Sequence, residues 1–292
     1  MSEAMTAVSR GARALFLLGA AAFFGLPLLW LLLAPTRTAD DLTTGSPLDF
    51  GSLGQVGEAW SHLTSYNDGE ITLWIGNSVI YAASSVALAL LLCVPAGYVL
   101  AKRDFAGRRV LLTLSVVTMI MPPAALVLPL YLEMSALGLT GTVWSVILPL
   151  SFYPFGVYLA FLHFQANLPD SLLDAARVDG ASELRLFWSV ALPLARPAIA
   201  LIAFFGFVRC WTDFFLPFVM LSDDRTFTLQ LGLMSLLQST GAVNNSSGFA
   251  DLDIHQPEAA LAGLVACAPL LIGFILAQRF LRTGLLAGAE KG

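Results

Sequence analysis

The chain alternates between long apolar runs and shorter polar stretches. Six apolar runs cover residues 14–34, 74–101, 110–134, 142–164, 198–221 and 259–280. A helix that crosses a bilayer needs about 20 mostly apolar residues. The pattern therefore predicts an all-α membrane protein with six transmembrane helices. The first run could also be a cleaved signal peptide, but its length and the absence of a clear small-residue cleavage box favour a retained anchor.

The polar stretches between the runs differ in charge. Residues 35–73 and 222–258 are rich in Asp and Glu. All but three of the 15 Lys and Arg residues lie in or beside the other polar stretches, which cover residues 1–13, 102–109, 165–197 and 281–292. Lys and Arg concentrate in the cytoplasmic loops of membrane proteins. We therefore expect both termini and residues 165–197 to be cytoplasmic, and the two acidic loops to lie outside.

The composition supports this class and argues against several others. The chain is 57% hydrophobic and 12% charged, with a mean hydropathy of +0.78, whereas a soluble domain carries about twice that charged fraction. No basic tract suggests nucleic acid, and the three cysteines lack a metal-binding or disulfide spacing. The chain has no GxxxxGK[ST] phosphate-binding loop, so we expect it neither to hydrolyse ATP nor to bind a cofactor.

Prolines interrupt the third apolar run. Pro122 and Pro123 lie near its middle, and each proline removes a backbone donor, so the run cannot form one straight helix. Broken backbone at membrane depth persists only against protein or beside a water-filled path. We therefore place these prolines near a translocation path, with a kinked packing helix as the alternative.

The fifth run contains two charged residues. Arg209 and Asp213 are four positions apart, hence on one helix face, where they can form an ion pair. An unpaired Arg at mid-membrane would cost roughly 2.5–3.5 kcal/mol, so both side chains should face protein or water. With Trp211 and Thr212 they would form the polar, aromatic wall of a translocation path. The alternative is an ion pair that only fixes helix packing.

Residues 165–197 are the longest polar interruption that still looks folded. Residues 174–178 have helical composition, and Gly180 then breaks the run and can adopt a positive φ. Ser182 is a suitable N-cap for a second helix, to which Leu184 and Phe187 give an apolar face. A helix, a glycine turn and an amphipathic helix suit a groove on another protein. A surface helix pair that merely covers a loop is the alternative.

This stretch resembles the cytoplasmic signature loop of ABC importer permeases, which begins E-A-A and places a glycine four positions later. The chain has Asp174-Ala175-Ala176, then Gly180, then Leu192-Pro193. The D-G-A-S stretch at residues 179–182 and the G-L-L-A-G-A-E-K-G ending resemble the sugar-importer branch, in particular the smaller six-span permease of maltose-type importers. The leading acid is Asp instead of Glu, which is one methylene shorter and leaves open any ion pair with the ATPase.

The resemblance implies a type I ABC importer permease fold, with residues 74–280 as the permease domain, in the cell membrane of a prokaryote. It implies a second homologous permease and two ATPase subunits, which would bind ATP and Mg. It also implies an extracytoplasmic substrate-binding lipoprotein that delivers a sugar.

The resemblance also assigns roles to individual residues. Residues 165–197 would form a coupling loop that contacts the ATPase, through Asp174, Ala175, Ala176, Asp179, Gly180, Glu183, Leu184, Phe187 and Pro193. The Trp-Thr-Asp-Phe stretch resembles a Trp-Asn-acid-Phe pattern of the family, and the candidate path residues are Arg209, Trp211, Thr212, Asp213, Pro122 and Pro123. In the outer loop, Gln230, Gln238, Asn244 and Asn245 would contact the binding protein.

Three alternatives remain open at this point. The cargo could be a sugar phosphate, an amino acid or a polyamine instead of a sugar. The chain could be an ion-coupled secondary transporter, which would need intramembrane acids or a paired repeat. It could also be a membrane scaffold whose loop only tethers a partner.

Overall fold

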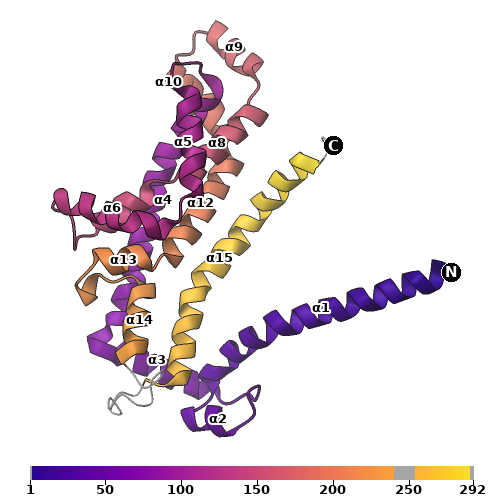
Figure 1. Ribbon diagram of the computed structural model, residues 1–292, viewed down its shortest axis with the longest axis vertical. Helices are drawn as coiled ribbons and strands as arrows, with labels where there is room; N and C mark the ends of the chain where they lie inside the picture. The colour runs from indigo at the N-terminus through magenta and orange to yellow at the C-terminus, as the bar shows by residue number, and fades with distance from the viewer. Residues whose placement is uncertain (1, 240–253, 290–292) are drawn as a thin grey trace. The chain divides into compact units, whose positions relative to one another are not determined.

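The computed structural model describes residues 2–239 and 254–289, which form helices joined by short turns and contain no strand (Figure 1). The prediction of an all-helical protein is confirmed for this part of the chain. The helices are α1 (Ser2–Leu33), η1 (Ala34–Thr36), α2 (Ala39–Thr44), α3 (Leu53–Ser65), η2 (Tyr66–Gly69), α4 (Glu70–Lys102), α5 (Arg108–Ile120), α6 (Pro123–Ala136), α7 (Trp144–Ser151), α8 (Pro154–Asn167), α9 (Asp170–Val178), α10 (Glu183–Leu186), η3 (Phe187–Ala191), α11 (Leu192–Leu194), α12 (Arg196–Thr212), α13 (Phe215–Met220), η4 (Asp224–Thr226), α14 (Leu229–Ser239) and α15 (Gln256–Ala289).

Several of these helices have the length and composition of membrane spans. Among the described residues, four segments qualify as they stand, namely Arg13–Thr36, Leu53–Lys102, Trp144–Asn167 and Gln256–Gln278. Two helix pairs qualify only when joined across a bend, which is 110° between α5 and α6 and 75° between the helical segment Glu183–Leu194 and α12. The first bend follows from Pro122 and Pro123, which supply no N–H to continue α5. The second lies at Ala195, two residues before Pro197.

The chain divides into two compact units, and the first combines Met1–Ile71 with Leu233–Ala268. In this unit the part of α1 from Ala14 onward carries apolar side chains on every side, and none of its membrane window is buried. A helix apolar on every side is suited to contact with lipid or with another membrane helix. In the same unit His62 Nδ1 of α3 lies 3.1 Å from Glu258 Oε1 of α15, which fixes the start of α15 against α3.

The second unit combines Thr72–Gly232 with Pro269–Gly292, and its core joins three helices to the coupling loop. The Tyr98 ring of α4 lies 5.5 Å from the Phe164 ring of α8 and 5.3 Å from the Phe187 ring of η3. Leu186 and Ile202 are buried in the same cluster. Apolar side chains therefore pack the coupling loop against α4, α8 and α12.

Candidate functional site

The coupling loop folds as two short helices joined by a glycine turn. Gly180 has a φ of +79°, as the sequence predicts. Its N–H donates to the Arg177 carbonyl at 3.0 Å, and the Ala181 N–H donates to the Ala176 carbonyl at 3.0 Å. These two bonds form a Schellman motif, which ends α9 and satisfies its last carbonyl groups. A residue with a Cβ is strained at this φ, so the turn depends on glycine.

The second half of the loop begins with a cap and contains a π-helical turn. The Ser182 hydroxyl accepts from the Arg185 N–H at 3.4 Å, which confirms the predicted N-cap of α10. In η3 the Leu192 N–H bonds to the Phe187 carbonyl, five residues back. Pro193 follows directly and offers no N–H to the preceding turn. Such π turns are rare and often occur at functional sites.

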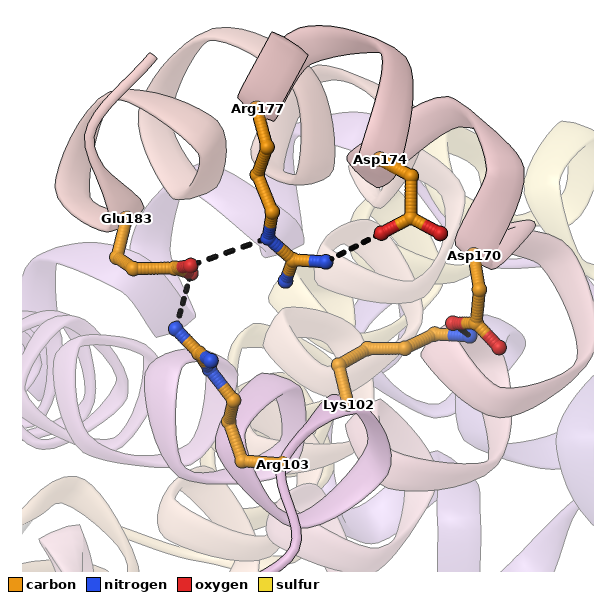
Figure 2. A network of polar contacts seen from close by, with 6 residues as sticks. All are labelled: Lys102, Arg103, Asp170, Asp174, Arg177 and Glu183. Atoms are coloured by element: carbon orange, nitrogen blue, oxygen red, sulfur yellow. Dashed lines mark hydrogen bonds and ion pairs between the residues drawn. The ribbon is translucent and has the colours of Figure 1, made fainter. Parts of the chain in front are cut away.

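Ion pairs tie the loop together and attach it to the end of α4 (Figure 2). Arg177 Nη1 lies 2.7 Å from Asp174 Oδ1, and Arg177 Nε lies 3.2 Å from Glu183 Oε1. Nη2 of Arg103, the residue just after α4, lies 2.5 Å from Glu183 Oε2. The acid at the head of the signature motif is therefore held within the loop by Arg177, and Glu183 bridges α9, α10 and α4.

A further ion pair attaches the beginning of α9 to α4. Lys102 Nζ lies 2.8 Å from Asp170 Oδ1, and the hydrogen bond and charge of Lys102 lower the pKa of that carboxyl below its usual range. The hydrogen bonds of Arg177 to Asp174 and Glu183 raise the pKa of its guanidinium. These carboxylates are largely exposed, so each pair contributes little stability by itself, but together they fix the position of both loop helices.

The residues of the predicted apolar face of the second helix differ in exposure, since some are buried and others are exposed. Leu186 and Phe187 are buried, whereas Leu184 is 69% exposed and Trp188 is 56% exposed. Val178, two residues before the glycine turn, is 88% exposed. Asp174, Ala175, Asp179, Gly180 and Pro193 are also exposed, Ala176 is half-buried, and Glu183 lies in the ion-pair network. The loop thus presents apolar side chains beside charged ones at its surface, a composition suited to a protein partner.

A second candidate site lies where three helix breaks converge. A cavity of about 320 Å³ is lined by residues at the α5–α6 break, the α7–α8 break and the end of α12. Its walls include Pro123, Tyr153 and Phe155, together with Arg209 and Asp213. Aromatic faces beside one cation and one carboxyl group can bind a polar ligand that also carries apolar C–H surface.

The guanidinium group of Arg209 donates hydrogen bonds to backbone carbonyl groups at the α7–α8 break and does not pair with Asp213. Its Nη1 donates to the carbonyl oxygens of Leu150 and Phe152, both at 3.1 Å, and its guanidinium carbon lies 5.3 Å from the centre of the Tyr153 ring. No ion pair between Arg209 and Asp213 occurs in the described part of the chain, so the expected pairing is wrong. The reason is that α12 ends at Thr212, and Asp213 is extended (φ −70°, ψ 120°).

Of the six candidate path residues, Pro123, Arg209 and Asp213 line this cavity, and the other three do not. Asp213 lines it and accepts a 3.1 Å bond from the Leu216 N–H, which starts α13. Trp211 is buried elsewhere, and the exposed Thr212 hydroxyl bonds to the Val208 carbonyl of its own helix. Pro122 forms the break but does not line the cavity.

Sequence reasoning missed three aromatic residues of this cavity, which lie around Pro154 at the α7–α8 break, namely Phe152, Tyr153 and Phe155. The signal was present, because a proline inside an apolar run marks a break in the helix. In the outer loop, Gln230 is half-buried and Gln238 is exposed, both in α14. Asn244 and Asn245 lie outside the described residues.

Comparison with known proteins shows which family of proteins the chain resembles. The family model of the binding-protein-dependent transport system inner membrane component matches residues 93–286. The arabinooligosaccharides transport system permease protein AraQ of Halalkalibacterium halodurans is 35% identical over 268 residues, which cover 91% of each chain. The diacetylchitobiose uptake system permease protein NgcG of Streptomyces coelicolor is 29% identical over 255 residues, covering 87% of this chain and 80% of the relative.

A solved structure also resembles this chain. It is described as the crystal structure of a bacterial ABC transporter involved in the import of the acidic polysaccharide alginate. One of its chains gives a TM-score of 0.79 at 22% identity and covers 93% of this chain and 96% of its own length. This match supports the fold.

The fold and the loop define an all-helical inner-membrane permease subunit. The chain belongs to the family of binding-protein-dependent transport system inner membrane components, because the family model matches more than half of its length. It is therefore a non-catalytic subunit of an ABC transporter, in which ATP hydrolysis takes place on partner subunits. This membership sets aside the ion-coupled secondary transporter and the scaffold.

Proposed function

We propose that this chain forms half of the translocation path of an ABC importer for a sugar or oligosaccharide. Relatives over most of its length are named as permeases for arabinooligosaccharides and diacetylchitobiose. The cavity at the helix breaks combines Tyr153 and Phe155 with Arg209 and Asp213. Aromatic rings can stack on the C–H faces of a pyranose while the charged groups bind its hydroxyls.

The proposed arrangement has six spans, with each bent helix pair counted as one, and both termini in the cytoplasm. The Lys and Arg residues support it, because they gather at the termini, at residues 102–109 and in the coupling loop. The acidic loops 35–73 and 222–258 then lie outside, where a substrate-binding lipoprotein delivers the sugar. A second permease completes the path.

The coupling loop is proposed to seat in a groove of an ATPase subunit that holds ATP and Mg. The observation that carries this proposal is the exposure of Val178 and Leu184 on either side of the rigid Gly180 turn. Exposed apolar side chains on an anchored helical loop can fill apolar pockets in the groove of a protein partner. Closure of the ATPases would then move the loop and, through it, the membrane helices.

Purification of the chain with its partners tests this function. We would attach a tag to the outer loop at residues 240–253, extract the native membranes with mild detergent and identify co-purifying proteins by mass spectrometry. Recovery of a second permease, an ATPase with a phosphate-binding loop and a lipid-anchored binding protein is expected. Recovery of the chain alone, in a preparation that still transports, would contradict the proposal.

A further inference from the structure

We propose that α4 is a rigid strut that connects the coupling loop to the outer segment at residues 224–232, so that a signal at either end reaches the other through this one helix. The inference rests on the proposed function, because it assumes that the coupling loop meets an ATPase and that the outer loop meets a binding protein. It concerns contacts that lie wholly within the second compact unit.

At its cytoplasmic end α4 is attached to both helices of the coupling loop. Lys102, whose side chain is only 7% exposed, pairs with Asp170 at the start of α9. Arg103 pairs with Glu183 at the start of α10. About one turn earlier in α4, the Tyr98 ring packs on the Phe187 ring. Two ion pairs and an aromatic contact at separate points restrict rotation as well as translation, so the loop and this end of α4 should move together.

At its other end α4 is attached to the outer segment by four side chains one turn or less apart. Trp74 Nε1 donates to the Asp224 carbonyl at 2.8 Å, and Tyr81 Oη donates to the Thr226 carbonyl at 2.8 Å. Asn77 Nδ2 donates to the carbonyls of Arg225 and Phe227, at 2.8 and 3.0 Å. Ser78 Oγ accepts from the Leu229 N–H at 2.7 Å.

These hydrogen bonds fix the backbone of the outer segment against α4. All the acceptors on the outer segment are backbone carbonyls, and the single donor on the segment is a backbone N–H. The segment is therefore held by its main chain, whatever its side chains contact. Gly232 completes the fit, because a Cβ at this position would lie 2.1 Å from an atom of the Trp74 ring. Any shift of α4 along its axis must carry the segment with it or break this set of bonds.

The helix between the two ends is continuous. α4 has 33 residues, which corresponds to about 50 Å at the rise of an α-helix. Pro95 lies inside this helix, and next to it the helix packs closely on α8, since a Cβ on Gly97 would lie 2.4 Å from the Ala160 Cβ. By contrast, breaks interrupt the apolar stretches formed by α5 and α6, by α7 and α8, and by α12 and α13. Among the helices whose described residues share a core with the coupling loop, namely α4, α8 and α12, α4 is thus the one suited to carry displacement to the outer segment.

Variants at the two ends of α4 test the strut in the complete importer, reconstituted with its ATPases and binding protein. Arg103→Gln removes the ion pair to Glu183, and Asn77→Ala removes two bonds to the outer segment. Matched controls are Arg109→Gln, a nearby exposed cation outside the network, and Val79→Ala, an exposed residue of the same helix. The measured quantity is the ratio of ATP hydrolysis with and without sugar-loaded binding protein.

We expect Arg103→Gln and Asn77→Ala each to lower this ratio by about two- to thirtyfold, the range seen when residues between coupled sites are changed, and the two controls to leave it unchanged. Because the two ends act in series, the double variant should be no worse than the more affected single variant. A general loss of folding would lower the amount of assembled complex but not the ratio. Arg103→Lys, which keeps the ion pair, should retain the wild-type ratio.

Three results would overturn the strut. The first is a wild-type ratio in Asn77→Ala, the second is additive losses in the double variant, and the third is an equal loss in Val79→Ala. If Asn77→Ala does not assemble, Tyr81→Phe serves in its place, because it deletes one hydroxyl and keeps the ring. Failure of the proposed function itself would look different, since the wild-type complex would then show neither stimulation by a binding protein nor uptake.

Discussion

Arg209 illustrates how a charged side chain persists in an apolar helix. Its guanidinium caps the carbonyl oxygens of Leu150 and Phe152, which the α7–α8 break leaves without helical partners. It also lies over the Tyr153 ring, a favourable position for a cation. The α7–α8 break and the Arg209 side chain therefore depend on each other, because carbonyl groups without hydrogen-bond donors are costly where water is excluded.

Replacement of Arg209 by Leu should destabilise the purified assembly. The change leaves two carbonyl groups without their donor, at about 1–3 kcal/mol for an unsatisfied group, and should lower the midpoint of thermal unfolding in detergent. Thr212→Val is the matched control, because its exposed hydroxyl bonds only within its own helix. An equal effect of both variants, or none for Arg209→Leu, would contradict the role assigned to Arg209.

The residue scale also shows what the sequence can predict. That Arg209 needs a partner follows from its apolar surroundings alone. Its actual partners do not, because they are main-chain groups about 60 positions away in the sequence. The expected partner Asp213 was chosen on the assumption that the helix continues to that residue. The helix ends one residue earlier, and the four-residue spacing then loses its meaning.

At the scale of elements, the glycine turn of the coupling loop gives a specific prediction for substitutions of Gly180. Valine at position 180 would have to adopt a φ of +79°, at a cost of about 1–2 kcal/mol, or roughly five- to thirtyfold in the population of the seated loop. We expect Gly180→Val to insert and assemble but to transport less sugar per ATP hydrolysed. Uptake and hydrolysis would be measured together in proteoliposomes.

Asparagine is the informative control at the same position. It tolerates the left-handed region far better than a β-branched residue does, so Gly180→Asn should keep most of the coupling. A wild-type ratio of uptake to hydrolysis in Gly180→Val would show that the turn conformation is not needed. So would equal impairment by both substitutions, which would point to side-chain bulk.

Local signals in the sequence predicted the elements of the loop well. The Gly180 turn and the Ser182 cap were predictable because each depends on a few neighbouring residues. The apolar face was not, because α10 has only four residues and a π-helical turn follows it. A π turn adds a residue to the helical repeat, so a spacing based on 3.6 residues per turn fails from Phe187 onward. The ion pairs from Lys102 and Arg103 join segments about 70 to 80 positions apart, beyond the reach of any local pattern.

At the scale of the whole molecule, hydropathy predicted the helical class but not the course of each helix. Prolines at positions 122 and 123 indicated a break, and the structure bends there by 110°. The third predicted span is thus two helices, and the fifth ends at Thr212 with α13 following. Composition cannot predict such angles, since they depend on the helices packed around the break.

The central claim is that the coupling loop lies in the cytoplasm and contacts an ATPase subunit. The most direct test attaches a thiol-reactive photo-crosslinker to Val178→Cys, a position 88% exposed beside the glycine turn. The native Cys267 is exposed and would first be replaced by Ser, whereas Cys93 and Cys210 are buried. Leu48→Cys, 44% exposed in the first acidic loop, serves as the control.

We expect illumination to link the Val178→Cys variant to the ATPase, with a yield that changes when a non-hydrolysable ATP analogue is added. Its thiol should react with impermeant reagents only from the cytoplasmic side, and that of Leu48→Cys only from outside. A link to the ATPase from Leu48→Cys but not from Val178→Cys, or reaction of Val178→Cys from outside, would contradict the account.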